Sequence, residues 1–151
     1  MTHTLISLLS ILSIFFSDSS SDKNENVTSK NSDMSGNKLI IKIGSNTFNA
    51  TFQNNPTTTA FKALLPITIN MTELNGNEKH ANLSRDLVTN ASNPETIQSG
   101  DLMLYGSNTL VLFYKSFTTS YSYTKIGRIN DTSRLTSAVG SENVMVTFEL
   151  E

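Results

Sequence analysis

The sequence predicts a mainly β protein, a closed antiparallel barrel of eight strands with two short helices that cover its ends. From residue 38 onward, short segments of alternating apolar and polar residues are separated by Gly, Asn and Ser. This spacing predicts strands that follow one another as hairpins. Two other segments carry their apolar residues at helical spacing. Successive short hairpin strands favour a closed barrel, because closure removes the exposed sheet edges.

The globular part is predicted to begin with a hairpin and a helix. Residues 38–43 and 47–52 form the hairpin around a Gly-Ser-Asn turn, and in the second strand every other residue is apolar. A helix follows, with Asn55 as its N-cap and Pro56 in its first turn. Its apolar stripe ends at Pro66, which stops the helix.

A second hairpin, at residues 99–117, is the clearest element of the second half. Two apolar runs rich in β-branched and aromatic residues flank another Gly-Ser-Asn turn, which predicts two strands near the centre of a sheet. A loop is predicted at residues 84–100. The remaining predicted elements are strands at residues 67–74, 78–83 and 123–129, a helix at residues 133–139 ended by Gly140, and a closing strand at residues 143–150.

Three segments are predicted along the chain. Residues 1–16 contain an apolar run of signal-peptide length that is too short to span a bilayer comfortably. Residues 17–37 hold only Val27 and Met34 as apolar residues, which predicts a disordered linker. Residues 38–151 form the barrel domain. A secreted or cell-envelope location follows if the first segment directs export; an uncleaved anchor or a wrongly assigned start codon are the alternatives.

Charge and composition exclude several classes of function. Residues 38–151 contain nine basic residues, six Lys and three Arg, and nine acidic ones, so the domain is formally neutral. A nucleic-acid surface requires clustered positive charge, so no nucleic-acid partner is expected. The chain has no Cys, which excludes disulfides and a Cys nucleophile. It also lacks a G-x-S-x-G motif and a Gly-rich phosphate loop.

Metal and carboxylate chemistry are also not expected. His80 is the only histidine after the first sixteen residues, which leaves no His-rich metal site. The carboxylates of Glu73 and Glu78 have no evident setting that would shift their pKa values. We therefore expect no catalytic residues, no metal and no cofactor.

Three motifs resemble the cyclophilin family. GDLMLYGSNTLVLFY at residues 100–114 resembles its strand, Gly/Asn-rich turn and strand ending in paired aromatics. YTKIGRI at residues 123–129 resembles its hydrophobic-Gly-x-hydrophobic strand before the second helix. Together with NGNEK at residues 75–79, these motifs most resemble small bacterial and archaeal cyclophilin-like domains without an assigned activity. The resemblance covers most of residues 38–151 and implies a cyclophilin-like barrel, whereas function belongs to the site.

The isomerase site of the family does not transfer to this chain. In prolyl isomerases of this fold, the strand after the first helix carries an F-x-R pattern, and the next strand a Gln-Gly-Gly segment. Here the strand at residues 67–74 has no arginine, and NGNEKH follows it. Amide rotation gathers a lone pair on nitrogen in its transition state, so a positioned cationic donor matters most for catalysis. Efficient isomerase activity is therefore not expected.

The resemblance leaves an apolar ligand site beside the hairpin. Phe113 matches the family's pocket aromatic, although an aromatic residue on a strand usually packs in a core. His80 could act as a base or donor, or be an ordinary surface residue. Tyr121 and Tyr123 could stack on a peptide or a glycan ring. The candidate ligand-binding residues are Met71, Glu78, His80, Tyr105, Phe113 and Arg128.

Two functional hypotheses follow. The first is an exported binding module that holds a peptide or small molecule in this pocket, with any membrane contact made only through an uncleaved first segment. The second is a weak or divergent prolyl isomerase in which Arg128 supplies the missing charge. A purely structural interaction domain would bind no peptide and catalyse no exchange. The sequence leaves the ligand and the oligomeric state open.

Overall fold

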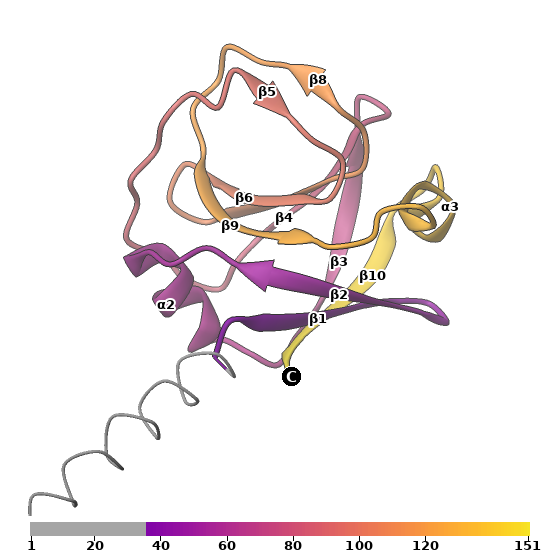
Figure 1. Ribbon diagram of the computed structural model, residues 1–151, viewed down its shortest axis with the longest axis horizontal. Coiled ribbons are helices and arrows are strands. Elements are labelled where there is room, and N and C mark those ends of the chain that lie inside the picture. Colours follow the sequence, from indigo (N-terminus) through magenta and orange to yellow (C-terminus); the bar gives the residue numbers. More distant parts are fainter. Residues whose placement is uncertain (1–35) are drawn as a thin grey trace, which may run out of the picture.

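A computed structural model describes residues 36–151 (Figure 1). The predicted segment 1–16, and residues 17–35 of the predicted linker, lie outside the described residues. Within residues 36–151, no helix is both long and apolar enough to cross a bilayer. The elements are β1 (Lys38–Ile43), β2 (Asn46–Phe52), α2 (Pro56–Lys62), β3 (Ile67–Leu74), β4 (Glu78–Asn82), β5 (Thr96–Ile97), β6 (Asp101–Tyr105), β7 (Thr109–Phe113), β8 (Phe117–Thr118), β9 (Thr124–Ile129), α3 (Leu135–Val139) and β10 (Val144–Leu150).

Eight of these strands close into an antiparallel barrel in the order β1-β10-β3-β4-β7-β6-β9-β2. This confirms the predicted fold class. Gly127 on β9 allows one of the closing contacts, because a Cβ at that position would lie only 2.8 Å from the backbone oxygen of Thr51 on β2. The glycine of the IGRI motif therefore lets β2 and β9 approach closely.

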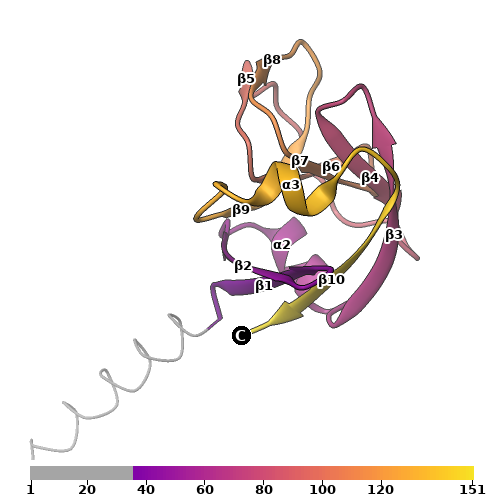
Figure 2. The ribbon, with the colours of Figure 1, turned by 90° about the vertical axis from the view of Figure 1, so that its right-hand side faces the viewer.

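The barrel interior is filled by alternate residues of its strands and closed at both ends by the helices. Figure 1 shows α2 and α3 at opposite ends of the barrel, and in Figure 2 α3 lies in front with α2 behind it. Phe61 of α2 is fully buried and makes edge-to-face contacts with Phe52 and Phe148, with ring centroids 6.4 Å and 6.0 Å apart. Leu135 and Val139 of α3 join the same core.

The two helices begin near the predicted residues but are shorter than predicted. The Asn55 side chain accepts a hydrogen bond from the Thr58 amide at 2.8 Å, as expected for an N-cap. The helix ends at Lys62, and the amides of Leu64 and Leu65 continue as turns. The second helix begins at Leu135, two residues after the predicted start, and ends at Gly140 with φ of 61°.

An outer layer covers one side of the barrel. The predicted loop at residues 84–100 contains β5, which pairs with β8, and Ser92 bridges to Tyr123. Figures 1 and 2 place this β5–β8 pair outside the barrel strands. The layer encloses a second hydrophobic cluster of Ile97, Met103, Val111, Phe113 and Tyr123, with Phe117 packed against it.

This arrangement explains why the hairpin at residues 99–117 is apolar on both faces. Alternate residues of β6 and β7, including Leu104 and Leu112, point into the barrel core. The residues between them, including Met103 and Val111, pack under the outer layer. The prediction of two strands near the centre of a sheet is confirmed, because β4 and β9 flank this hairpin on either side.

Candidate functional site

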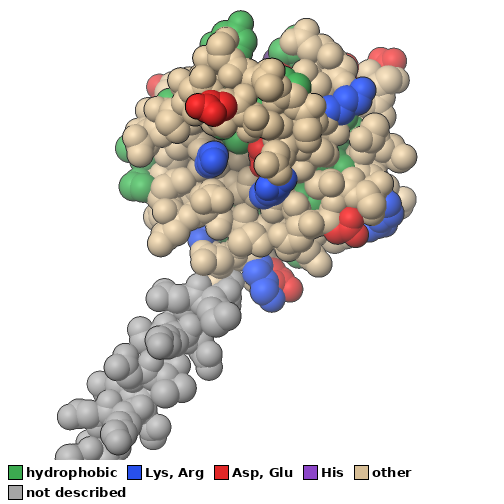
Figure 3. Space-filling model, turned by 45° about the horizontal axis from the view of Figure 1, so that its top comes forward, with side chains coloured by type: hydrophobic (Ala, Val, Ile, Leu, Met, Phe, Trp, Pro, Cys, Tyr) green, Lys and Arg blue, Asp and Glu red, His purple; other side chains and the backbone are tan. Residues whose placement is uncertain are grey.

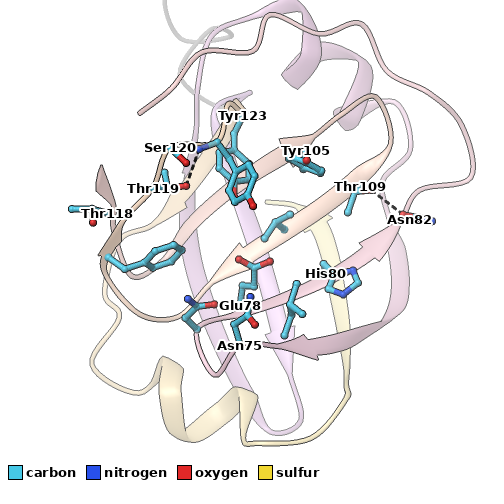
Figure 4. Close-up of a pocket in the computed structure, with 15 residues that line it drawn as sticks. Asn75, Glu78, His80, Asn82, Tyr105, Thr109, Thr118, Thr119, Ser120 and Tyr123 are labelled. Carbon is cyan, nitrogen blue, oxygen red and sulfur yellow. Dashed lines mark hydrogen bonds between the residues drawn. The ribbon is translucent and has the colours of Figure 1, made fainter. Parts of the chain in front are cut away.

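A cavity of about 580 Å³ opens between the outer face of the barrel and the segment at residues 117–123. Its floor is built from outward-facing residues of β4, β7 and β6, and its other wall from the segment that follows β7 (Figure 4). No residue of 84–100, all of which the structure describes, lines it. The lining residues are Leu74, Asn75, Asn77, Glu78, His80, Asn82, Tyr105, Thr109, Val111, Phe117, Thr118, Thr119, Ser120, Tyr121 and Tyr123.

Three tyrosines form one side of the cavity. The ring of Tyr105, at the end of β6, lies 6.2 Å from that of Tyr121 in an edge-to-face arrangement and 5.6 Å from that of Tyr123 in a tilted one. Tyr105 and Tyr121 remain 47% and 62% exposed, whereas Tyr123 is buried. Two tyrosine rings are therefore open to a ligand, and the third supports them.

Glu78 supplies the negative charge of the cavity. It begins β4, directly opposite Phe113 of β7, and its carboxylate points into the cavity from the floor (Figure 4). Burial raises the pKa of Glu78, and the charge of Glu73 adds to this effect. Burial, and then the charge of Glu78, raise the pKa of Tyr123. Among the described residues that line the cavity, none is Lys or Arg.

Polar groups complete the lining. Thr109 donates a hydrogen bond to the side-chain oxygen of Asn82 at 3.0 Å, and the Tyr121 amide donates to the Thr119 hydroxyl at 3.1 Å (Figure 4). The side-chain oxygen of Asn77 is buried and has no hydrogen-bond partner within residues 36–151. The Asn77 oxygen is too buried to contact a ligand, so further acceptors come from lining residues such as Asn75 and Ser120.

The structure brings three of the six candidate ligand-binding residues together. Glu78, His80 and Tyr105 line the cavity. Phe113 is fully buried beneath it, with its ring centroid 5.7 Å from that of Phe117 and 5.4 Å from that of Tyr123. It supports the cavity wall without facing the cavity.

The other two candidates lie elsewhere. Met71 of β3 is fully buried in the barrel core. Arg128 of β9 is exposed and lines a separate depression, where it pairs with Asp101 at 3.6 Å and donates to Gln98. Burial raises the pKa of Asp101, while the Gln98 amide and the Arg128 charge counteract that effect.

Sequence reasoning missed most of the polar lining. Asn75, Asn77, Asn82, Thr109 and the segment from Thr118 to Ser120 are turn or strand-end residues in an Asn-, Ser- and Thr-rich chain. Nothing in their spacing marks them, because the chain returns from β7 to cover the outer face of β4. The tyrosine pair at positions 121 and 123 was the available signal.

A second charged cluster lies inside one end of the barrel. Lys79 is fully buried, and its ammonium group donates to the Glu73 carboxylate and to the carbonyl oxygens of Gly140 at 3.0 Å and Glu142 at 2.6 Å. The Tyr114 hydroxyl donates to the same carboxylate at 2.7 Å. All three ammonium donors are therefore used. This cluster ties β3 and β4 to the loop before β10. Glu73 and Tyr114 also line a depression of about 540 Å³, but the Tyr114 hydroxyl and the Lys79 ammonium group already donate to the Glu73 carboxylate there.

The expectation of ordinary pKa values for Glu73 and Glu78 is wrong for both. Burial acts to raise the pKa of Glu73, but hydrogen bonds from Lys79 and Tyr114, the Lys79 charge and the Gly76 amide together lower it. Glu78, which points to the other face of the sheet, has its pKa raised by burial. Sequence reasoning missed the difference because it depends on which face each residue occupies.

The comparison with known families follows this geometry. A model of the Cyclophilin-like family matches residues 41–149, more than half of the chain. The chain belongs to the cyclophilin-like family. No curated protein and no solved structure is significantly similar to it. In this cyclophilin-like domain, the cavity borders β4 and carries a carboxylate and no Lys or Arg among its described lining residues.

The size and the lining of the cavity decide which kinds of group it could accommodate. Its size falls in the range of cavities that hold small organic ligands, about 300–1,000 Å³. Within residues 36–151, no group of three or more His, Cys, Asp or Glu side chains lies close enough to hold a metal ion. In the cavity itself, Glu78 and His80 are the metal-binding residue types that the described lining provides. Aromatic rings and oxygen acceptors are therefore its main recognition groups.

Proposed function

We propose that this protein is an exported cyclophilin-like binding module that holds a peptide or small molecule in the cavity between β4 and the segment at residues 117–123. The observation that carries this proposal is the cavity itself, of about 580 Å³, in which Tyr105 and Tyr121 keep about half of their surface open. Exposed aromatic surface in a concave site is typical of ligand recognition.

The charges of the cavity argue against efficient isomerase activity. Catalysis of amide rotation requires a cationic donor near the prolyl nitrogen. The charged group that faces this cavity is the carboxylate of Glu78. Arg128, the candidate replacement for the missing arginine, is engaged by Asp101 and Gln98 in a separate depression. Binding without catalysis is therefore the function that this geometry supports best.

The proposed location rests on the first segment of the chain. Residues 5–16 are mostly apolar and have the length of a signal-peptide core. We propose that this segment directs export, so that the domain acts outside the cytoplasm. If the segment stays uncleaved, it would also hold the protein at a membrane.

The test is an NMR titration of the full-length protein with a panel of Ala-Xaa-Pro peptides. Cis/trans exchange rates of the peptides and chemical shifts of the protein are recorded in the same samples. We expect exchange at the uncatalysed rate, and shift changes concentrated at Tyr105, Thr109 and residues 117–123. Exchange above the uncatalysed rate would instead support the divergent isomerase, and shift changes elsewhere would exclude this cavity.

The variant that checks the site is Tyr121→Ala. Tyr121 is 62% exposed, so its truncation is expected to weaken binding without unfolding the protein. Phe113→Ala is less informative, because Phe113 is fully buried and its loss would damage the fold itself. Val88→Ala is the matched control, since Val88 is 56% exposed and does not line the cavity. Equal affinities for both variants would contradict the proposed site.

A further inference from the structure

The cavity combines a negative charge with open tyrosine rings. Within residues 36–151, the carboxylate of Glu78 makes no hydrogen bond and no ion pair with another side chain, although it lies in a partly buried position. Its neighbour Lys79 points into the barrel and is fully engaged there by Glu73, Gly140 and Glu142. A partly buried carboxylate without a counter-charge favours a cationic ligand.

The tyrosines are placed to receive the same kind of ligand. Tyr105 and Tyr121 meet edge to face, with planes at 85° to one another, and Tyr123 is tilted by 52° to Tyr105. In an edge-to-face pair one ring covers part of the face of the other, but both tyrosines line the cavity and remain 47% and 62% exposed, so ring surface stays open to a ligand. An ammonium group over the face of a tyrosine gains about 0.5–2 kcal/mol, depending on how far it is desolvated.

The remaining acceptors also match an ammonium group. An ammonium group has three donors and no acceptor. Beside Glu78, the lining contains Thr118 and Ser120, whose hydroxyl oxygens can accept hydrogen bonds. The cavity of about 580 Å³ is larger than one alkylammonium chain requires, and its rim carries hydroxyl and amide groups, including Thr109 and Asn82, that suit a peptide backbone.

We infer that the cavity selects a peptide through one lysine side chain, whose ammonium group contacts Glu78 and the rings of Tyr105 and Tyr121. This inference rests on the proposed binding function and names its ligand class. The lysine stem would cover the exposed tyrosine surface, and the peptide backbone would lie along the polar rim.

The test is calorimetric titration of the full-length protein with two tripeptides, acetyl-Ala-Lys-Ala-amide and its norleucine analogue, which has a similar side-chain length and no charge. We expect the lysine peptide to bind about tenfold or more tightly than the norleucine peptide, and Glu78→Gln to remove most of that preference. The control is Glu149→Gln, because Glu149 forms an exposed ion pair with Lys42 on the other side of the barrel.

A second pair of variants tests the aromatic contact. Tyr121→Leu removes the ring and should lose about two- to fivefold in affinity for the lysine peptide, whereas Val88→Ala, an exposed position outside the cavity, should leave that affinity unchanged. Equal affinity for the lysine and norleucine peptides would overturn the inference but leave the binding function standing. Binding of neither peptide, with no shift change at the cavity in the peptide panel, would count against the binding function itself. If n-butylammonium binds as tightly as the lysine peptide, the assignment to a peptide is overturned.

Discussion

Glu78 and Lys79 are neighbours on β4, yet they occupy opposite electrostatic settings. Lys79 points into the barrel, is fully buried and satisfies its charge with Glu73 and two carbonyl oxygens. Glu78 points outward into the cavity, where its charge has no partner within residues 36–151 and burial raises its pKa. The paired charge stabilises the fold, and the unpaired one is available to a ligand.

The same contrast separates the barrel interior from the outer layer. The interior is closed by helices at both ends and packed with fully buried aromatic and aliphatic side chains. The outer layer covers β6 and β7 with two short strands and leaves one side open as the cavity. On the face shown in Figure 3, charged side chains of both signs are scattered without a concentrated patch. The cavity is thus where aromatic surface and an unpaired charge coincide.

The largest effect is expected when the interior pair is broken. Glu73→Gln should lower the free energy of unfolding by about 3 kcal/mol at neutral pH, because it leaves the buried ammonium group of Lys79 without its counter-charge. Urea unfolding measures this loss. Glu149→Gln breaks an exposed ion pair and should cost less than about 1 kcal/mol. Equal losses of stability in the two variants would show that the buried ion pair stabilises the fold no more than the exposed one does.

A smaller effect is expected from the tyrosine in the same cluster. Tyr114→Phe removes the hydroxyl that donates to the Glu73 carboxylate and should cost about 1.5 kcal/mol in urea unfolding. Burial, the hydrogen bond to Glu73 and the Glu73 charge raise the pKa of Tyr114 to about 12. Ultraviolet titration of tyrosinate should therefore lose its most alkaline step in this variant. Tyr121→Phe, on the exposed cavity rim, should leave both that step and the stability unchanged.

The smallest change in the free energy of unfolding is expected for a substitution in the cavity, and it is a gain of stability, not a loss. The folded-state pKa of Glu78 is raised above the ordinary value of 4.5, so its contribution to stability is full below that pH and is lost as pH rises through the folded-state pKa. Glu78→Gln should therefore stabilise the unliganded protein at neutral pH, by no more than about 1 kcal/mol.

The pH dependence sharpens the contrast between the two carboxylates. The advantage of Glu78→Gln should disappear below pH 4.5, where Glu78 is protonated in both states. Glu73 has a lowered pKa and therefore the opposite pH dependence. Its contribution to stability is present above pH 4.5 and is lost as pH falls through the folded-state pKa. Urea unfolding between neutral and acidic pH measures both. A loss of stability in Glu78→Gln at neutral pH would contradict the unpaired setting of Glu78.

The sequence by itself determined the barrel. Alternation of apolar residues and closely spaced turns are local signals, so the eight barrel strands, both helices and the hairpin pairings β1–β2, β3–β4 and β6–β7 were predictable. The other five pairings of the barrel join strands that are not consecutive in the chain, and no local signal marks them. The N-cap at Asn55 and the glycine at the end of α3 are equally local. The helix α2 is shorter than predicted because its apolar stripe continues into turns after the helical hydrogen bonds end, whereas α3 lacks only the first two predicted residues, which form a turn.

Only the tertiary structure decided the site. The sequence shows by its alternation that Glu78 and Lys79 lie on opposite faces of β4. It does not show which face lines the barrel interior and which is covered by residues 117–123. That depends on residues 117–123, which reach the outer face of β4 through long-range contacts with no periodic signature. For the same reason Phe113 and Met71, chosen as pocket residues by resemblance, are buried in two different cores. Local pattern fixes which residues share a strand face, whereas the surroundings of each face are set by packing between distant segments.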